Sequence, residues 1–514
     1  MHDIKLWVKT KLVMVHTLLI KNKSKRVQRF VLAPEPELTQ ALLDKKWLVL
    51  LVSLTVTGSF HFKGIIMSTT VSNPLPNSPN SKKIVTAAII GSALEFYDFV
   101  LYAFFAVYIG KAFFPSDDPF ISLLLSLAVF GIGFITRPLG SIILGIVADR
   151  KGRKIALLLT ILFITVGTIG LALTPSYASI GIAAPIIVLT CRLLQGFGLG
   201  GEVGPSSAFL IESAPSHKRG LFGSWQLACQ GFAAIMAGAF GIIMILSLNT
   251  EDMFAWGWRV PFFLTLLLIP IALYLRNNMA ETLHENDVNT LSSPTNSLHS
   301  SDKAHPSKTK KAYVPSVVKT GEFWRKVFIA FWAIAGITVP LYISIYMNTY
   351  ATTTLKLSPA ISMSATLVSG IAILMFAVLG GWLSDKFGRK NLMFWPRIVL
   401  VLISLPLFNY LVNNIGLSSL MITTFVLTGF TALSGGACLV AVPELFDRKI
   451  RATGLSVAYA GVAILFGSTT QPAIAWLIEW TGSPVAPAWY MMFIVSLSII
   501  AVWFMEETGN KPLK

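Results

Sequence analysis

The chain has 514 residues, of which 54% are hydrophobic and 13% are charged, and its mean hydropathy is +0.69. Soluble domains carry about 25% charged residues, so about half of the expected charge is missing. One membrane span needs about 20 apolar residues, and this composition supplies enough for about a dozen. These figures exclude a soluble enzyme, a nucleic-acid-binding domain and a disordered scaffold, and they predict a polytopic membrane protein.

The 41 basic and 24 acidic residues give a formal net charge of +17. The basic residues fall in short gaps between apolar runs, which is typical of the positive-inside rule rather than of nucleic-acid binding. Cys191, Cys229 and Cys438 lie inside apolar runs, without a Cys-x-x-Cys or Cys/His cluster. Neither a disulfide framework nor a metal site is therefore expected.

Apolar runs separated by charged or Pro/Gly-rich gaps predict an all-α fold with twelve transmembrane helices in two bundles of six. The first six cover 84–112, 120–147, 155–174, 182–210, 221–247 and 258–276. The second six cover 326–350, 359–383, 391–411, 417–443, 453–478 and 487–505.

The charges in the gaps predict the orientation of these helices. The gap 149–154 carries four basic residues, and the gaps at Lys218, Lys386 and Arg448 are basic too. Alternate gaps such as 115–119 contain acidic residues and neither Lys nor Arg. This alternation predicts that the basic gaps, and both ends of the twelve-helix unit, face the cytoplasm.

The chain is expected to divide into a leader, two bundles, a linker and a tail. Residues 84–276 and 326–505 form the expected bundles, and 506–514 form a cytoplasmic tail. Residues 277–325 are rich in Ser, Asn, Pro, Thr and Lys, which is typical of a flexible cytoplasmic linker.

The leader, residues 1–83, has several interpretations. Residues 1–66 hold 11 basic and 4 acidic residues, and their one apolar run, Trp47 to Gly58, has 12 residues, too few for an ordinary span. A disordered or interfacial segment and a thirteenth helix are both open. We favour a start site assigned too early, because Met67 opens a polar stretch that leads directly into the first helix.

The two bundles contain an internal repeat. The run Gly145 to Lys154 matches Gly381 to Lys390 at an offset of 236 residues. A second match, at an offset of 232, joins Glu212 with Glu444 and Arg219 with Arg451. Internal repeats of this kind are typical of secondary transporters that bind their solute between two bundles.

The repeated loop resembles the G-x-x-x-D-R/K-x-G-R-[RK] signature of the major facilitator superfamily, and the likeness covers about residues 84–505. Further motifs resemble the metabolite–proton symporter family: Glu95-Phe-Tyr-Asp98-Phe99, Arg137-Pro-Leu-Gly140, Arg192-Leu-Leu-Gln195-Gly196, Gly201-Glu202, Ser224-Trp-Gln226 and Tyr346-Met-Asn-Thr-Tyr350. Members of that family carry citrate, α-ketoglutarate, shikimate, or proline and betaine, and citrate–proton symporters resemble this chain most. The resemblance implies the major facilitator fold, a multi-pass protein of the bacterial inner (plasma) membrane, and transport driven by a proton gradient without a bound cofactor. We expect a monomer with no nucleic-acid partner.

Three carboxylates inside predicted spans are candidates for proton coupling: Glu95, Asp98 and Glu202. Ionisable groups inside a membrane are costly and are therefore functional hypotheses. Glu95 and Asp98 stand three residues apart on one side of a helix, and two such carboxylates in a low dielectric cannot both stay ionised easily. The structural alternative is that one of them pairs with an arginine and holds the bundle together.

The candidates for solute binding are Arg137, Arg192, Gln195, Gln226 and Tyr346. A guanidinium offers a planar fork that matches a carboxylate, so two arginines suit an anionic solute. Gln195 shares a helix face with Arg192 and either holds its guanidinium or touches the solute. The second bundle has almost no charged residues away from helix ends, and Arg397 is expected near a cytoplasmic helix end.

The repeated loops predict gates. A carboxylate that faces a helix end and basic neighbours can latch one side of a transporter. The candidate gate residues are Gly145, Asp149, Arg153, Glu212, Arg219, Asp385, Arg389, Glu444 and Arg451. Charges that serve only topology would not need these acids.

Two functions remain open on this scaffold, and enzymatic activity is not expected. The first is proton-coupled symport, by alternating access, of a small organic acid such as a citrate-like di- or tricarboxylate. The alternative is proton symport of the compatible solutes proline and betaine, whose cationic nitrogen favours aromatic rings. The pair Arg137 and Arg192 favours the acid.

Overall fold

The structure, a computed structural model, describes residues 92–93, 96–151, 153–200, 214–277, 321–447, 450–509 and 511. These residues lie within one compact unit of the chain, Ser78–Lys514. They form helices joined by short turns, and this described part contains no β-strand. The leader and residues 278–320 of the expected linker lie outside the described residues.

The helices before the linker begin with a bent pair, Phe96–Phe104 and α5 (Ala106–Phe113). They continue as α6 (Pro119–Ile132), α7 (Arg137–Lys151), α8 (Arg153–Leu173), α9 (Tyr177–Ile180), α10 (Ala183–Gly200), α12 (Arg219–Ser247), α13 (Thr250–Ala255) and α14 (Val260–Asn277). Short 3₁₀ turns cover Ser216–Lys218 and Gly257–Arg259.

The helices after the linker are α16 (Gly321–Thr353), α17 (Pro359–Phe387), α18 (Arg389–Asn413), α19 (Leu417–Glu444), α20 (Arg451–Val462), α21 (Thr470–Thr481) and α22 (Ala486–Trp503). A π-helical turn, Ala463–Gly467, connects α20 to α21. Each of the twelve predicted stretches contains helix, so the all-α prediction is confirmed. Nine described helices are long and apolar enough to cross a membrane, and the bent pair makes a tenth.

Local sequence explains where several helices begin. Asp118 caps α6, since its carboxylate accepts the Phe120 backbone N–H at 2.8 Å and Pro119 occupies the first turn. Helix α16 is described from Gly321, before the predicted boundary at residue 326. Glu322 lies in its first turn and pairs with Lys326 at 3.0 Å, and both features stabilise a helix start.

Glycines let α10 approach its neighbours closely, and this approach positions the site. A Cβ atom on Gly196 would lie 1.8 Å from the Gly133 carbonyl oxygen, and one on Gly200 would lie 2.0 Å from that of Arg137. No side chain fits such spaces, so these glycines serve helix packing. The contact places α10 directly against the segment where α6 gives way to α7.

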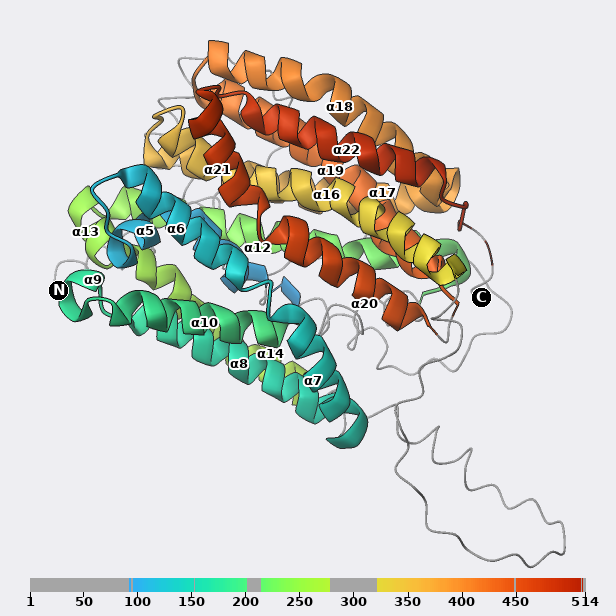
Figure 1. Ribbon diagram of the computed structural model, residues 1–514, viewed down its shortest axis with the longest axis horizontal. Helices are drawn as coiled ribbons and strands as arrows, with labels where there is room; N and C mark the ends of the chain where they lie inside the picture. Colours follow the sequence, from blue (N-terminus) through green and yellow to red (C-terminus); the bar gives the residue numbers. More distant parts are fainter. Residues whose placement is uncertain are drawn as a thin grey trace, which may run out of the picture. The chain divides into compact units, whose positions relative to one another are not determined.

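The helices on either side of the linker pack together. Helix α12 precedes the linker, yet it contacts α17 more extensively than any other helix and also touches α19. Gly231 and Gly370 mark the contact, because a Cβ on Gly231 would lie 2.7 Å from the Gly370 oxygen. Figure 1 shows α12, in green, between the blue to green helices that precede the linker and the yellow to red helices that follow it.

Arg397, predicted near the cytoplasmic end of its helix, is the ninth of the 25 residues of α18 and is completely buried inside the second bundle. Its guanidinium donates to Ser434 Oγ at 2.9 Å, Ser498 Oγ at 2.7 Å and the Ala333 carbonyl at 2.8 Å. These neutral acceptors belong to α19, α22 and α16. A buried cation is tolerated here because each nitrogen finds an acceptor.

Candidate functional site

Asp98, Gln195 and Arg192 form one hydrogen-bonded group, called here the buried charge cluster. Gln195 Nε2 donates to Asp98 Oδ2 at 2.6 Å, and Arg192 Nη1 donates to Gln195 Oε1 at 2.6 Å. Each of the three residues is only 2% exposed. The amide of Gln195 therefore bridges a carboxylate and a guanidinium, which confirms that Gln195 shares a face with Arg192.

A third helix supports this cluster. Gln195 Nε2 also donates to Thr168 Oγ1 of α8 at 3.1 Å, and Thr168 in turn donates to the Ile164 carbonyl at 2.9 Å. The orientation of the amide is thus set from outside the cluster. Its oxygen must face Arg192 because its nitrogen is engaged by two acceptors.

The cluster keeps unused hydrogen-bonding capacity. Asp98 Oδ1, Arg192 Nε and Arg192 Nη2 have no hydrogen-bond partner among the described residues. Leaving a buried polar atom unpaired costs about 1–3 kcal/mol, so each is a place where a ligand or proton would be stabilised. A carboxylate could accept from the two arginine nitrogens, and a proton could bind Asp98.

Aromatic rings surround both arginines. The Arg192 guanidinium carbon lies 4.0 Å from the ring centre of Tyr102 and 5.9 Å from that of Phe99. The Arg137 guanidinium carbon lies 4.0 Å from Phe134 and 4.8 Å from the same Phe99. The structure therefore brings both predicted arginines close to one ring, that of Phe99. Cation–π attraction holds them in place while leaving N–H groups available.

Arg137 is 6% exposed and lies at the first position of α7, and its Nε has no hydrogen-bond partner among the described residues. From the second bundle, Tyr342 of α16 packs its ring edge against Phe134, with centres 5.6 Å apart. The two arginines thus sit in the first bundle, next to a residue of the second.

A second contact joins the bundles at the bend of the first helix. The helix Phe96–Phe104 and α5 meet at 69°. Asn348 Nδ2 of α16 donates to the Phe104 carbonyl at 3.0 Å. The bend leaves this carbonyl available, and a side chain of the other bundle uses it.

The remaining predicted binding residues lie apart from the arginines. Gln226, on α12, lines a cavity together with Gln230 and Tyr459. Tyr346 is 3% exposed and packs in the largest apolar core cluster of the second bundle. Motif resemblance made both candidates for solute binding, and the structure places Gln226 at this cavity and Tyr346 in the apolar core.

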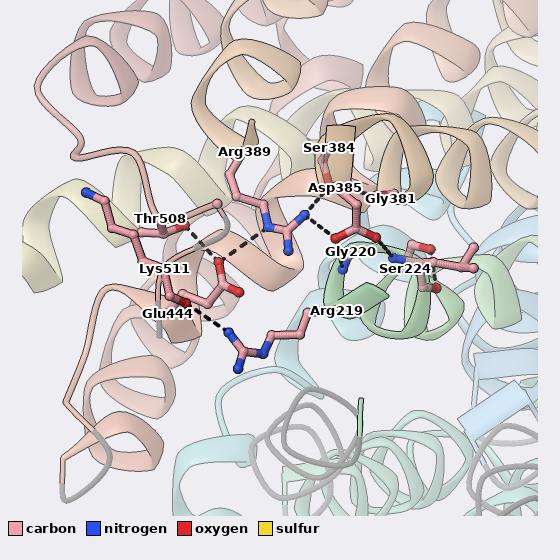
Figure 2. A network of polar contacts seen from close by, with 12 residues as sticks. Arg219, Gly220, Ser224, Gly381, Ser384, Asp385, Arg389, Glu444, Thr508 and Lys511 are labelled. Carbon is pink, nitrogen blue, oxygen red and sulfur yellow. Dashed lines mark hydrogen bonds and ion pairs between the residues drawn. The ribbon is translucent and has the colours of Figure 1, made fainter. Parts of the chain in front are cut away.

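Asp385, Arg389 and Glu444 meet where the start of α12, after the basic gap at Lys218, touches the end of α17 at the basic gap of Lys386, a place called here the basic end (Figure 2). Arg389 Nη1 donates to Asp385 Oδ1 at 2.8 Å and its Nε donates to Glu444 Oε2 at 3.3 Å. Asp385 Oδ1 and Oδ2 also accept the backbone N–H groups of Gly220 and Leu221 at 2.8 and 2.9 Å. A carboxylate from the second bundle therefore caps the start of α12 in the first.

Residues after the last helix complete this network, and no sequence motif indicated them. Thr508 Oγ1 donates to Glu444 Oε2 at 2.8 Å, and Arg219 Nη1 donates to the Lys511 carbonyl at 3.1 Å (Figure 2). The Glu507 carboxylate accepts the backbone N–H groups of Arg389 and Lys390 at 2.8 and 3.0 Å. The described residues of the predicted tail thus contact both bundles.

The other predicted gate residues are only partly described. Arg451 is 2% exposed and donates through Nε to the Pro443 carbonyl at 3.1 Å. Gly145, Asp149 and Arg153 lie in α7 and α8, but their surroundings lie outside what is described. Glu95, Glu202 and Glu212 lie outside the described residues altogether.

Metal binding finds no support within the described ranges, where no three His, Cys, Asp or Glu side chains come together. Cys191, Cys229 and Cys438 are free and buried.

Comparison with known proteins identifies the family. Residues 84–514 match the family model described as "Sugar (and other) transporter". The chain is 33% identical over 439 residues to the proline/betaine transporter of Salmonella typhimurium, which covers 84% of this chain and 85% of the relative. It is 32% identical over 403 residues to the citrate-proton symporter of Salmonella typhi, covering 78% of this chain and 88% of the relative.

Solved structures share the fold. The crystal structure of a D-xylose-proton symporter matches 84% of this chain and 99% of its own length, with a TM-score of 0.65 and 20% sequence identity. The relatives are transporters rather than enzymes, as expected from the sequence. The chain belongs to the sugar (and other) transporter family, within the major facilitator superfamily, and is a multi-pass membrane transport protein.

Proposed function

We propose that the protein is a proton-coupled symporter of a small carboxylate-bearing solute, working by alternating access in the bacterial inner membrane. The main support for this proposal is the buried charge cluster. In it, Gln195 joins Asp98 to Arg192, and both charged residues keep polar atoms without a hydrogen-bond partner among the described residues. Two relatives support proton coupling, since they are named citrate-proton symporters, and a solved neighbour is a D-xylose-proton symporter.

The proton would act through the charge of the cluster. Protonation of Asp98 removes one negative charge beside Arg192, and the cluster then carries a net positive charge that attracts a carboxylate. Deprotonation restores the balance and weakens the hold on the solute. Proton and solute would therefore bind together and leave together, which is the requirement for symport.

Two solute classes share the carboxylate. An organic acid such as citrate is favoured by the two arginines, each with at least one nitrogen unpaired among the described residues. Proline or betaine is favoured by the rings of Phe99, Tyr102 and Phe134 around the site and by the identity to proline/betaine transporters. We therefore propose a solute that bears a carboxylate, and we favour a citrate-like acid over proline or betaine.

The basic end would be the cytoplasmic gate, with both ends of the helical unit on that side. This orientation follows from the basic gaps. The network of Asp385, Arg389 and Glu444 would hold the gate shut while the solute binds from the opposite side. Opening requires the Asp385 carboxylate to leave the N-terminus of α12.

The test is uptake of labelled citrate and labelled proline into proteoliposomes under an imposed inward proton gradient, with and without a protonophore. Arg192→Lys keeps the charge but loses the planar fork, so we expect uptake to fall at least about 30-fold. Arg397→Lys is the matched control, because Arg397 is equally buried but bonds only to neutral groups.

Uptake that survives Arg192→Lys, or that persists without a proton gradient, would overturn the proposal. Accumulation of proline but not of citrate would show that the solute belongs to the second class, proline and betaine.

A further inference from the structure

The helix that α20 and α21 form together is interrupted by the π-helical turn Ala463–Gly467. The Ser468 backbone N–H donates to the Ala463 carbonyl, five residues earlier, at 3.0 Å. A π-turn holds one residue more than an α-helical turn, is rare, and is frequent at functional sites. Side chains after the turn are rotated by about 100° relative to an uninterrupted helix, because each residue adds that angle.

Hydroxyl groups of the chain itself support this turn. The next three residues, Ser468, Thr469 and Thr470, each donate a side-chain hydrogen bond to the carbonyl four residues earlier, within the π-turn. Hydroxyl groups that bond to the helix backbone in this way often bend it. The local sequence therefore favours an interruption at this place.

The π-turn touches the first bundle through backbone atoms. A Cβ atom on Gly131 of α6 would lie 2.2 Å from the Ser468 carbonyl oxygen, so the two backbones are in direct contact. A Cβ atom on Gly467 would lie 2.8 Å from the ring of Phe134, which follows α6 in the chain. Figure 1 shows α6, in blue-green, against α21, in red. The turn therefore lies directly beside the segment that leads to Arg137.

Gly467 faces Phe134, while its bulky neighbour faces elsewhere. Phe466 packs against Phe331 and Trp332 of α16, with ring centres 5.9 and 6.0 Å apart. No side chain fits at Gly467 unless the Phe134 ring shifts. The π-turn thus presents its one residue without a side chain to a ring of the first bundle.

Phe134 contacts the candidate solute site at the same time. It is 1% exposed, and its ring centre lies 4.0 Å from the Arg137 guanidinium carbon. The rings of Phe99 and Tyr342 also pack against it, with centres 5.2 and 5.6 Å away. A ring packed this closely cannot move without disturbing the guanidinium that lies over it. One ring therefore connects Gly467 of the second bundle to Arg137 of the first.

We infer that Gly467 and Phe134 are positioning residues, through which the second bundle determines where the Arg137 guanidinium points. The inference rests on the proposed function, since it takes Arg137 to bind the solute carboxylate. When the second bundle moves, the space that Gly467 leaves for the Phe134 ring moves with it. The affinity of Arg137 for the carboxylate then differs between the two states of the transporter, and solute binding favours one of them.

The experiment is a double-mutant cycle on KM and kcat for gradient-driven uptake of labelled citrate and labelled proline. Gly467→Ala displaces the Phe134 ring and should raise KM about fivefold with kcat nearly unchanged. Phe134→Leu removes the ring with its cation–π contact and should raise KM about tenfold. Leucine leaves room for the new methyl group, so adding Gly467→Ala to Phe134→Leu should raise KM no further.

Gly461→Ala is the matched control. Gly461 belongs to the same span, and its Cβ would lie 3.3 Å from Phe331, a residue of the second bundle. This variant makes the same gain in helix propensity and should keep the wild-type KM. The inference is refuted if Gly467→Ala raises KM equally with and without the Phe134 ring, or if Gly461→Ala raises it as much. An unchanged KM in Phe134→Leu also refutes it, and this variant tests the ring even where Gly467→Ala does not fold.

Thermal stabilisation of the purified protein in detergent by citrate or proline separates this inference from the proposed function, because it measures binding without a proton gradient. A wild type that binds a solute but shows no proton-driven uptake would contradict the proposed function. The same variants, compared by their dissociation constants, would still test the inference. If uptake is proton-driven while Gly467→Ala and Phe134→Leu bind the solute as the wild type does, the proposed function stands and the inference is wrong.

Discussion

Arg389 on α18 donates from Nε to Glu444 Oε2 on α19 at 3.3 Å, while its Nη1 reaches Asp385 of α17 at 2.8 Å. One guanidinium thus serves two carboxylates that come from different helices, α17 and α19. Asp385 in turn caps α12 of the other bundle through Gly220 and Leu221. Arg389 therefore holds the carboxylate that joins the two bundles at the basic end.

Arg389→Met should destabilise the protein and loosen the basic end. Removing one member of a buried ion pair costs about 3–5 kcal/mol, because the remaining carboxylates lose their partner without regaining water. The expected result is a clearly lower thermal unfolding temperature in detergent and faster labelling of a cysteine placed at residue 221. Lys326→Met is the control, because its partner Glu322 is exposed and such a pair contributes about 0.3–0.5 kcal/mol. Equal loss of stability in both variants would contradict the gate.

Asp98→Asn should uncouple solute movement from the proton gradient. The amide is neutral at every pH and can still accept from Gln195, so the cluster resembles its protonated form permanently. We expect solute exchange across the membrane to continue while gradient-driven accumulation falls to the level seen with a protonophore. Solute affinity of the wild type should rise as the pH falls, and that of the variant should be flat. If the proton gradient still drives solute accumulation in Asp98→Asn, a group other than Asp98 carries the coupled proton.

Glu507→Ala should weaken the start of α18. The Glu507 carboxylate accepts two backbone N–H groups there, and loss of a capping side chain costs about 0.5–2 kcal/mol. Hydrogen exchange of the Arg389 and Lys390 amides should accelerate, and the thermal unfolding temperature should fall by less than in Arg389→Met. Glu506→Ala is the matched control, because its contact with Arg325, at 3.8 Å, is exposed. Unchanged exchange in Glu507→Ala would show that the cap does not hold the helix.

Gly196→Ala should prevent correct packing of α10. Its Cβ would lie 1.8 Å from the Gly133 oxygen, a backbone atom that cannot move aside without shifting α6. We expect little folded protein in size-exclusion chromatography. Gly321→Ala should be tolerated, since nothing lies within 4 Å of its Cβ position. Normal yield of Gly196→Ala would mean that α10 and α6 are farther apart than described.

Sequence alone determined the membrane class, the all-α fold, the repeat and the family resemblance, because these depend on hydropathy and on short motifs. Spacing within one helix also predicted that Gln195 shares a face with Arg192, since residues three apart lie on the same side of a helix. Tertiary structure decided the partners across helices. Gln195 meets Asp98, 97 positions away, because glycines bring α10 against its neighbours, and no spacing in the sequence records that approach. For the same reason the pairing of Arg389 with Glu444, the contribution of Glu507 and Thr508, and the burial of Arg397 follow only from the packing of helices that are distant in sequence.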